Sequence, residues 1–275
     1  MQIASTVAHA RAFFDVLPRP LGFIPTMGAL HDGHLALVRR AREECASVAA
    51  SVFVNPMQFG ANEDLGKYPR DLDGDRKKLD DAGVDVLFAP DEAVMYPPGY
   101  STYVDVGPMG TTFEGAVRPT HFRGVATVVT KLLHVVHPDV LYLGQKDAQQ
   151  TAVLRRVFRD LDLPVRVEVV PTVRESDGLA MSSRNAYLSD EQRAAAPTLF
   201  RALGELHDAL ANGASKTEAI DRARATLAAT VTLDYFDVVD ALTFEPKDAL
   251  DGKAFVIGAV RLGPTRLLDN IVVER

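Results

Sequence analysis

Two histidines, His31 and His34, flank a glycine in the sequence His31-Asp32-Gly33-His34. The motif follows the apolar run Leu21–Ile24, where a buried strand is expected to turn into a helix. A helix N-terminus has unpaired N–H groups and a partial positive charge, which suit it to phosphate binding. Imidazole can donate hydrogen bonds to the same phosphate. An isolated histidine is more often a surface or core residue, and it is the strand-to-helix setting that favours a nucleotide site here.

A second candidate is the sequence Gly144-Gln145-Lys146-Asp147, which directly follows the apolar run Val140–Leu143. Ligands of open parallel sheets bind at the carboxyl ends of the strands. A lysine at the start of the next helix brings a mobile positive charge to a phosphate. The alternative is a solvated lysine and aspartate that merely begin a helix.

A third candidate is the polar segment 181–185, Met-Ser-Ser-Arg-Asn, which follows Asp177 and Gly178. Its two hydroxyls, its guanidinium and its backbone N–H groups can surround a polyphosphate. Taken in isolation, the segment reads equally as a polar loop ahead of a helix. Its value as a site therefore depends on the other motifs.

Amide side chains form a fourth candidate after the apolar run Val48–Val54. Asn55 and Gln58 present donors and acceptors that can recognise the hydroxyl and carboxylate groups of a small polar substrate. Gln149 and Gln150 can add similar contacts. The alternative is that Asn55 and Gln58 only stabilise a turn.

Several chemistries are disfavoured by what the sequence lacks. Cys45 is the one cysteine, so no internal disulfide can form, and we expect it to be a small core residue. The His-x-x-His spacing has no third ligand nearby, which argues against structural zinc. No Walker loop or Gly-x-Gly-x-x-Gly motif occurs, which argues against a P-loop kinase and an ordinary dinucleotide-binding oxidoreductase.

Alternating short apolar runs and amphipathic segments over about the first 175 residues predict an α/β domain with a parallel sheet and helices on both faces. The expected strands are 21–24, 48–54, 84–88, 140–143 and 165–170, and the expected helices are 33–46, 69–82, 124–136 and 147–161. The stretch Gly107–His121 is long for a plain connection, and both a binding loop and a mobile surface loop fit its composition.

The pattern changes after Thr172, which predicts a division into domains 1–174 and 175–275, with the 181–185 loop near the start of the second. One helix is expected over 189–211, with Ser189 as N-cap and Gln192 completing a capping box. A second helix is expected over 216–230, followed by strands at 235–239, 254–262 and 266–273. Two helices and a small antiparallel sheet make a smaller α+β domain.

The composition is that of an ordinary soluble globular protein. The 275 residues are 47% hydrophobic and 24% charged, with a formal net charge of −7. The acidic balance argues against a general nucleic-acid surface. No apolar run approaches the roughly 20 residues of a membrane span, and no secretory pattern opens the sequence. We therefore expect a cytoplasmic protein that binds neither nucleic acid nor membrane.

Taken together, the motifs resemble those of known nucleotide-handling enzymes. The strand, His-x-Gly-His and helix unit is similar to that of nucleotidylyltransferases and class I aminoacyl-tRNA synthetases, and 181–184 resembles their second phosphate loop. More closely, segments 25–34, 54–60, 118–124, 144–147 and 181–185 resemble the pantoate–β-alanine ligase family in the same order. The resemblance extends to 68–70 and 267–270, with small departures at Met57, Thr120 and Gln145.

The resemblance implies a Rossmann-like amino-terminal domain, a smaller carboxyl-terminal domain and a homodimer. It also implies that ATP, accompanied by Mg²⁺, and (R)-pantoate form pantoyl-adenylate and pyrophosphate. β-Alanine then displaces AMP to give pantothenate. No metal site built from protein side chains is implied.

Site residues carry over from the family position by position. The ATP site would comprise Met27, Gly28, Ala29, Leu30, His31, Asp32, Gly33, His34, Gly144, Gln145, Lys146, Asp147, Val173, Met181, Ser182, Ser183 and Arg184. His34 would be the catalytic acid, with His31 positioning the nucleotide and Lys146 stabilising phosphate charge. Gln58 would contact pantoate and β-alanine, and Gln150 would contact pantoate.

Three other functions remain to be distinguished at this point. Another adenylate- or nucleotidyl-forming enzyme on the same fold, such as a cytidylyltransferase, is disfavoured by segments 55–60 and 118–124, and incubation with candidate acids would decide. A nucleotide-binding regulator would bind ATP without releasing pyrophosphate. An RNA-binding synthetase-like protein is disfavoured by the acidic balance.

Overall fold

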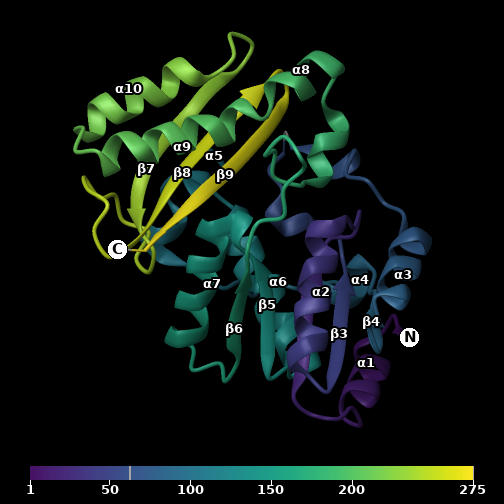
Figure 1. Ribbon diagram of the computed structural model, residues 1–275. Coiled ribbons are helices and arrows are strands. Elements are labelled where there is room, and N and C mark those ends of the chain that lie inside the picture. The colour runs from purple at the N-terminus through teal and green to yellow at the C-terminus, as the bar shows by residue number, and fades with distance from the viewer. Residues whose placement is uncertain (62, 275) are drawn as a thin grey trace. The chain divides into compact units, whose positions relative to one another are not determined.

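The computed structural model describes residues 1–61 and 63–274 and divides into two compact units (Figure 1). The first unit comprises Met1–Gly144 and Val153–Val170, and the second comprises Gln145–Ala152 and Pro171–Arg275. The division predicted after residue 174 differs from this by four residues. It also did not anticipate that 145–152 belong with the second unit, a grouping that depends on contacts with residues far along the chain.

The first unit is built on a six-stranded parallel sheet in the order β1-β4-β3-β2-β5-β6. Its strands are β1 Gln2–Ala4, β2 Leu21–Thr26, β3 Ser47–Val52, β4 Val86–Phe88, β5 Val140–Gly144 and β6 Arg166–Val170. From β2 the chain proceeds to β3 and β4 on one side, whereas β5 pairs with the other side of β2. The strand order therefore reverses between β2 and β5, and ligands of open α/β sheets bind outside the strand ends at such a point.

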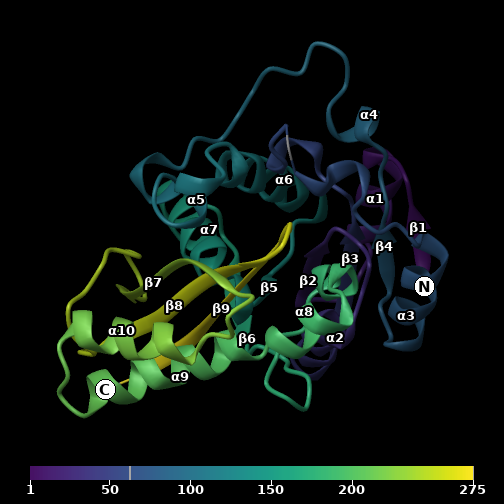
Figure 2. The same cartoon turned by 90° about the horizontal axis from the view of Figure 1, so that it is seen from above.

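Helices cover both faces of this sheet, as predicted, so that α2 and α6 lie on opposite sides of β2 and β3 (Figure 2). The unit's longer helices are α1 Val7–Phe14, α2 Asp32–Glu44, α3 Leu72–Asp81 and α6 His121–Val136, with short α4 Glu92–Met95 and α5 Glu114–Val117 between β4 and α6. Helix α7 Ala148–Asp160 belongs to this unit from Val153 onward. Because side chains alternate along a strand, Phe23 packs with α1 and α6 while Ile24 packs with α2 and α3. Cys45 lies buried in the latter core, which confirms its predicted structural role.

The second unit is a three-stranded antiparallel sheet in the order β7-β8-β9, with helices on one face. Its strands are β7 Thr232–Asp240, β8 Lys253–Leu262 and β9 Thr265–Glu274, and its helices are α8 Asp190–Ala195, α9 Thr198–Ala211 and α10 Lys216–Thr226. Figure 2 shows α9 and α10 running along one side of β8 and β9. The predicted α+β arrangement is thus present.

Three details differ from the sequence expectations. The single helix expected over 189–211 is wrong, because Pro197 separates α8 from α9; proline lacks the N–H that would continue the helix. The predicted capping box between Ser189 and Gln192 is present at the start of α8. Neither β1 nor α1 was predicted; β1 is an edge strand with only Ala4 buried, so its sequence carries little signal. Finally, α10 ends at Thr226 rather than Thr230.

Candidate active site

The two motif histidines close the N-terminus of α2 by capping each other's backbone. His31 is the N-cap residue, and its Nδ1 accepts the Gly33 N–H at 3.2 Å. The His31 N–H donates to Nδ1 of His34 at 3.3 Å, and the two ring centroids lie 4.1 Å apart. Because both Nδ1 atoms accept, each neutral ring carries its proton on Nε2. The pair thus lies at a helix N-terminus, a position that suits an anion.

The loop between β2 and α2 is held in a left-handed conformation by a buried carboxylate. Gly28 and Ala29 have φ angles of 81° and 51°. Asp75, on α3 and 1% exposed, accepts the Ala29 N–H at 2.9 Å and the Leu30 N–H at 2.8 Å. A Cβ on Gly28 would lie 2.8 Å from the Asp75 carboxylate, so the close approach requires glycine. Asp75 could not be singled out from the sequence, because three aspartates near the start of α3 look alike there.

The Gln58 side chain lies beside this loop. It sits in the 3₁₀ turn Pro56–Gln58, where Nδ2 of Asn55 donates to its Oε1 at 2.9 Å. Its own Nε2 donates to the Met27 sulfur at 3.1 Å. The Tyr96 hydroxyl donates to Oδ1 of Asn55 at 2.7 Å, and burial raises the pKa of Tyr96, which keeps that proton in place. The structure thus brings together Met27 and Gln58, two predicted site residues, and adds Tyr96.

A partly buried ion pair and a buried histidine hold the main chain at Gln58. Arg118 donates from Nε to the Glu63 carboxylate at 2.9 Å and from Nη2 to the Gln58 carbonyl at 3.2 Å. The Gln58 carbonyl also lies 3.0 Å from Nδ1 of His121, which must donate to it, leaving Nε2 to accept from Arg118. Burial and the neighbouring Arg118 lower the pKa of His121 to about 4, so the ring is neutral near pH 7.

Glu63 remains charged within this cluster. Burial alone would raise the pKa of Glu63, but the hydrogen bonds and charge of Arg118 outweigh it and lower that pKa. Gly124 allows α6 to approach the turn, since a Cβ there would lie 2.3 Å from the Met57 carbonyl oxygen. Segment 118–124, which resembles the family motif, thus has the physical role of holding the turn at Gln58. Glu63 carries no signal in the sequence that distinguishes it from other surface acids.

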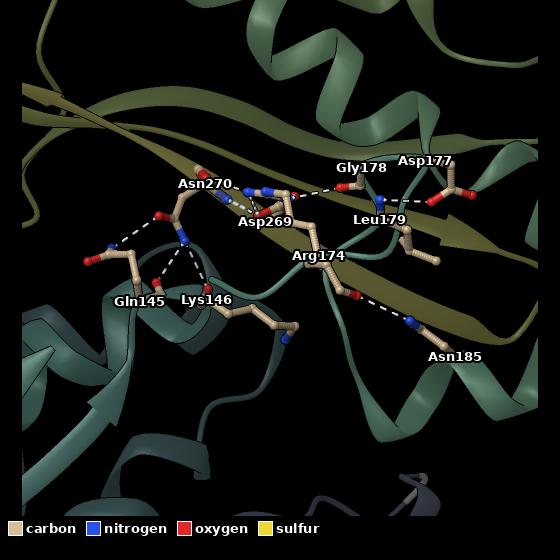
Figure 3. A network of polar contacts seen from close by, with 10 residues as sticks. Gln145, Lys146, Arg174, Asp177, Gly178, Leu179, Asn185, Asp269 and Asn270 are labelled. Atoms are coloured by element: carbon tan, nitrogen blue, oxygen red, sulfur yellow. Dashed lines mark hydrogen bonds and ion pairs between the residues drawn. The ribbon is translucent and has the colours of Figure 1, made fainter. Parts of the chain in front are cut away.

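The remaining predicted residues lie after β5. Gly144 ends that strand, and Gln145, Lys146 and Asp147 form a 3₁₀ turn in the second unit. Lys146 Nζ lies 3.4 Å from the Asp147 carboxylate, and its side chain is 21% exposed. The carbonyls of Gln145 and Lys146 accept from Asn270 (Figure 3). Gln150 follows in the first turn of α7.

The serine-rich loop, residues 181–185, belongs to the same unit, and backbone pairing ahead of it holds it in place. The Met181 N–H donates to the Val173 carbonyl at 3.0 Å, and Arg174 pairs with Ala180 in an antiparallel bridge. Ser182 then caps the 3₁₀ turn Ser183–Tyr187, because its Oγ accepts the Arg184 N–H at 3.3 Å. Predicted residues Val173 and Met181–Arg184 therefore form one continuous structural segment.

The site residues thus fall into two groups. Met27–His34 and Gln58 lie in the first unit, and 145–147, Gln150, Val173 and Met181–Arg184 lie in the second. Loop 27–31 follows β2 and Gly144 ends β5, the two strands that border the point where the strand order reverses. Among residues 1–61 and 63–274, no group of three or more His, Cys, Asp or Glu side chains is placed to hold a metal ion. Over the same residues, no helix has the length and apolar character needed to cross a bilayer.

A parallel α/β sheet with a His-x-Gly-His helix start at its reversal point defines a nucleotide-binding protein of the Rossmann-like class. Residues 2–272 match the model of the family described as Pantoate-beta-alanine ligase. The chain belongs to the pantoate–β-alanine ligase family.

Individual relatives agree with this assignment. The pantothenate synthetase of Heliobacterium modesticaldum is 53% identical over 262 residues, which cover 93% of this chain and 92% of the relative. The crystal structure of pantothenate synthetase from Thermus thermophilus aligns over 100% of both chains with a TM-score of 0.95 at 51% identity.

A third relative was solved with ligands. Pantoate-beta-alanine ligase from Francisella tularensis, complexed with beta-gamma ATP and beta-alanine, covers 99% of this chain and 97% of its own, with a TM-score of 0.82 at 33% identity. The predicted fold class and family resemblance are thereby confirmed.

Proposed function

We propose that this chain condenses (R)-pantoate with β-alanine in an ATP-dependent reaction, through a pantoyl-adenylate. The observation that carries the proposal is the family match over residues 2–272, with the His31 and His34 cap intact at the reversal point of the sheet. The ligand complex of the Francisella relative supports ATP and β-alanine as substrates.

In the first half-reaction, a pantoate carboxylate oxygen attacks the α-phosphorus of ATP. The O–P bond of the adenylate forms, the bond to the bridging oxygen breaks, and pyrophosphate leaves. Because the carboxylate is already ionised at neutral pH, no general base is needed. The step depends on in-line placement and on stabilising phosphate charge.

The residues divide this work between them. We assign charge stabilisation to the Nε2–H group of His34 and to the Lys146 ammonium, with His31 orienting the nucleotide. Ser182, Ser183 and Arg184 are assigned to the β- and γ-phosphates, since hydroxyls and a guanidinium suit phosphate oxygens. The backbone of 27–30, which Asp75 holds, would lie against the nucleotide.

In the second half-reaction, the neutral amine of β-alanine attacks the acyl carbon of the adenylate. The amide C–N bond forms, the acyl–oxygen bond breaks, AMP leaves, and the amine proton passes to solvent or a phosphate oxygen. Gln58 is assigned to pantoate and β-alanine and Gln150 to pantoate. The Asn55 hydrogen bond fixes which end of the Gln58 amide carries the oxygen.

Mg²⁺ is expected to enter with ATP, because it favours oxygen ligands and binds largely through substrate phosphates and water. It would neutralise phosphate charge during adenylation. The hydroxyls of Ser182 and Ser183 and the Asp147 carboxylate are oxygen donors of the kind that this ion accepts. A homodimer is a further prediction of the family resemblance, to be tested by sedimentation. A cytoplasmic location is the prediction of the sequence pattern, to be tested by cell fractionation.

The decisive experiment measures pyrophosphate release from ATP with pantoate, first without and then with β-alanine. We expect release that requires pantoate, followed by AMP and pantothenate only when β-alanine is added. Release with CTP in place of ATP would favour a cytidylyltransferase instead. ATP binding with no pyrophosphate release under any condition would favour a nucleotide-binding regulator.

A further inference from the structure

Two consecutive polar residues, Asp269 and Asn270, are buried in the middle of β9, and the proposed reaction does not use them. Each is 4% exposed. Side chains alternate along a strand, so Asp269 falls in the same row as Leu267 and Ile271, which pack into the core beneath α9. Burying a carboxylate in an apolar row is costly unless it is paired. The residue that pairs with the Asp269 carboxylate therefore indicates the role of this part of β9.

The partner of Asp269 is Arg174, which leads into the serine-rich loop. Both guanidinium Nη atoms donate to the carboxylate, with Nη2 at 3.0 Å from Oδ1. The same guanidinium donates to the Gly178 carbonyl at 3.1 Å and lies 3.7 Å over the ring of Phe200 on α9. This two-pronged geometry fixes orientation as well as distance. Asp269 therefore holds the base of the hairpin that carries 181–184.

Asn270 points to the opposite face and holds the turn that carries Lys146. Its Nδ2 donates to the Gln145 carbonyl at 3.0 Å and to the Lys146 carbonyl at 2.9 Å, and its Oδ1 accepts from Nε2 of Gln145 at 3.1 Å. Figure 3 shows these contacts beside the Arg174 pair. The Asn270 N–H also donates to the Asp269 carboxylate at 2.8 Å, which links the two anchors.

We propose that Asp269 and Asn270 are positioning residues for the adenylation step, which hold Lys146 and the 181–184 loop at a fixed separation from one strand. The proposal rests on the function proposed above, because it takes the roles of those residues from there. Preorganised charge stabilisers lose their effect when displaced, and a shift of about 1 Å can cost about 100-fold in rate. The loss should therefore appear in kcat more than in the KM for ATP.

The test uses Asn270→Asp, which keeps the shape and one acceptor but sets a carboxylate oxygen against two carbonyl oxygens. We expect kcat for pantoate-dependent pyrophosphate release to fall about 100-fold, with the KM for ATP changing less than about fivefold. Hydrogen exchange at the amides of residues 145–148 should rise at least about tenfold, since the turn loses its anchor.

The matched control is Asp234→Asn in the same sheet. Asp234 accepts from Nε of Arg261 at 2.9 Å and Nε of Arg266 at 2.6 Å, and it holds neither Lys146 nor the 174–185 segment. This variant should lose stability to urea while keeping kcat within about threefold of wild type. Urea unfolding of all three proteins establishes that the comparison is between folded enzymes.

Two outcomes overturn the proposal. One is a folded Asn270→Asp enzyme with kcat within about threefold of wild type, and the other is an equal kcat loss in Asp234→Asn. The proposed function is tested separately by pantoate-dependent release in the wild-type enzyme. If the wild-type enzyme releases no pyrophosphate, hydrogen exchange alone decides, and unchanged exchange at 145–148 in Asn270→Asp overturns the proposal.

Discussion

The loop after β2 is one region that carries predicted phosphate-binding residues, and the turn 145–147 together with the loop 172–185 is another, but the two regions are held in different ways. In the first, His31, Gly33 and His34 cap one another within four residues of sequence. In the second, Arg174 and Asp269 are 95 residues apart, and Lys146 and Asn270 are 124 residues apart. A local motif thus makes its own geometry in the first loop, whereas a distant strand supplies it in the second.

One of the distant supports of the first loop is the Asp75 carboxylate, 46 residues from Ala29. It holds backbone N–H groups, whereas Asn270 holds backbone carbonyls. Both supports act on the main chain and leave the reactive side chain to the substrate. A site assembled in this way is sensitive to substitutions that touch no ligand.

The largest expected effect comes from removing one charge stabiliser from each loop region. His34→Ala and Lys146→Ala should each lower the adenylation rate at least ~100-fold, the scale of one lost preorganised donor. Pyrophosphate release at saturating ATP and pantoate measures it, with urea unfolding as the folding check. Exposed His134 provides the control His134→Ala, which should keep the wild-type rate. Near-normal adenylation in His34→Ala or Lys146→Ala would remove that residue from the mechanism.

Asp75→Asn weakens the distant support of the first loop. It turns one of two acceptors into a donor that faces a backbone N–H, so stability should fall by about 2 kcal/mol and adenylation should slow. Urea unfolding measures the first effect. Asp73→Asn on the same helix, where the side chain is 94% exposed, should change stability by less than about 0.5 kcal/mol. Equal losses in the two variants would contradict the role given to Asp75.

The cluster that holds Gln58 should make the first unit sensitive to acid. The pKa of His121 is lowered to about 4 in the folded protein against about 6.5 unfolded, so protonation favours the unfolded chain. The contribution of neutral His121 to the free energy of unfolding is present above pH 6.5 and declines as the pH falls toward 4. Between pH 7 and pH 5, the free energy of unfolding should fall by about 1–2 kcal/mol because of His121.

Urea unfolding at both pH values, for wild type and His121→Gln, isolates this effect. At pH 7 the variant should have a lower free energy of unfolding than wild type, and the difference between the two proteins should be smaller at pH 5. A gap that does not change with pH would show that His121 is not held neutral by the fold.

The smallest expected effect comes from Gly204 on α9, the helix that covers the sheet of the second unit. A Cβ on Gly204 meets nothing within 4 Å, and alanine favours a helix interior over glycine. Gly204→Ala should therefore raise stability by about 0.5–1 kcal/mol and leave adenylation unchanged. A thermal melt and the pyrophosphate assay check both. An altered adenylation rate in Gly204→Ala would show that this part of α9 helps to position Lys146 or the 181–184 loop, a role given above to β9.

Sequence patterns predicted the parallel sheet, its covering helices and the small antiparallel domain, because apolar periodicity reports which face of an element is buried. These patterns did not predict elements with few buried residues, or the burial of individual charged side chains. β1 has one buried residue in three, and Pro197 divides what the periodicity presents as one helix. Asp75, Glu63 and Asp269 look in the sequence like other acids, since burial and partnership are not local properties.

By itself, the sequence determined the residue types and the local geometry of this protein. The His31 and His34 cap and the strand and helix periodicities follow from residues within a few positions of one another. Only the tertiary structure decided which carboxylates are buried and which distant strand anchors the turn at Lys146. Local hydrogen bonds are encoded by spacing, whereas a contact such as that of Arg174 with Asp269, 95 positions apart, exists only once the packed core brings the two residues together.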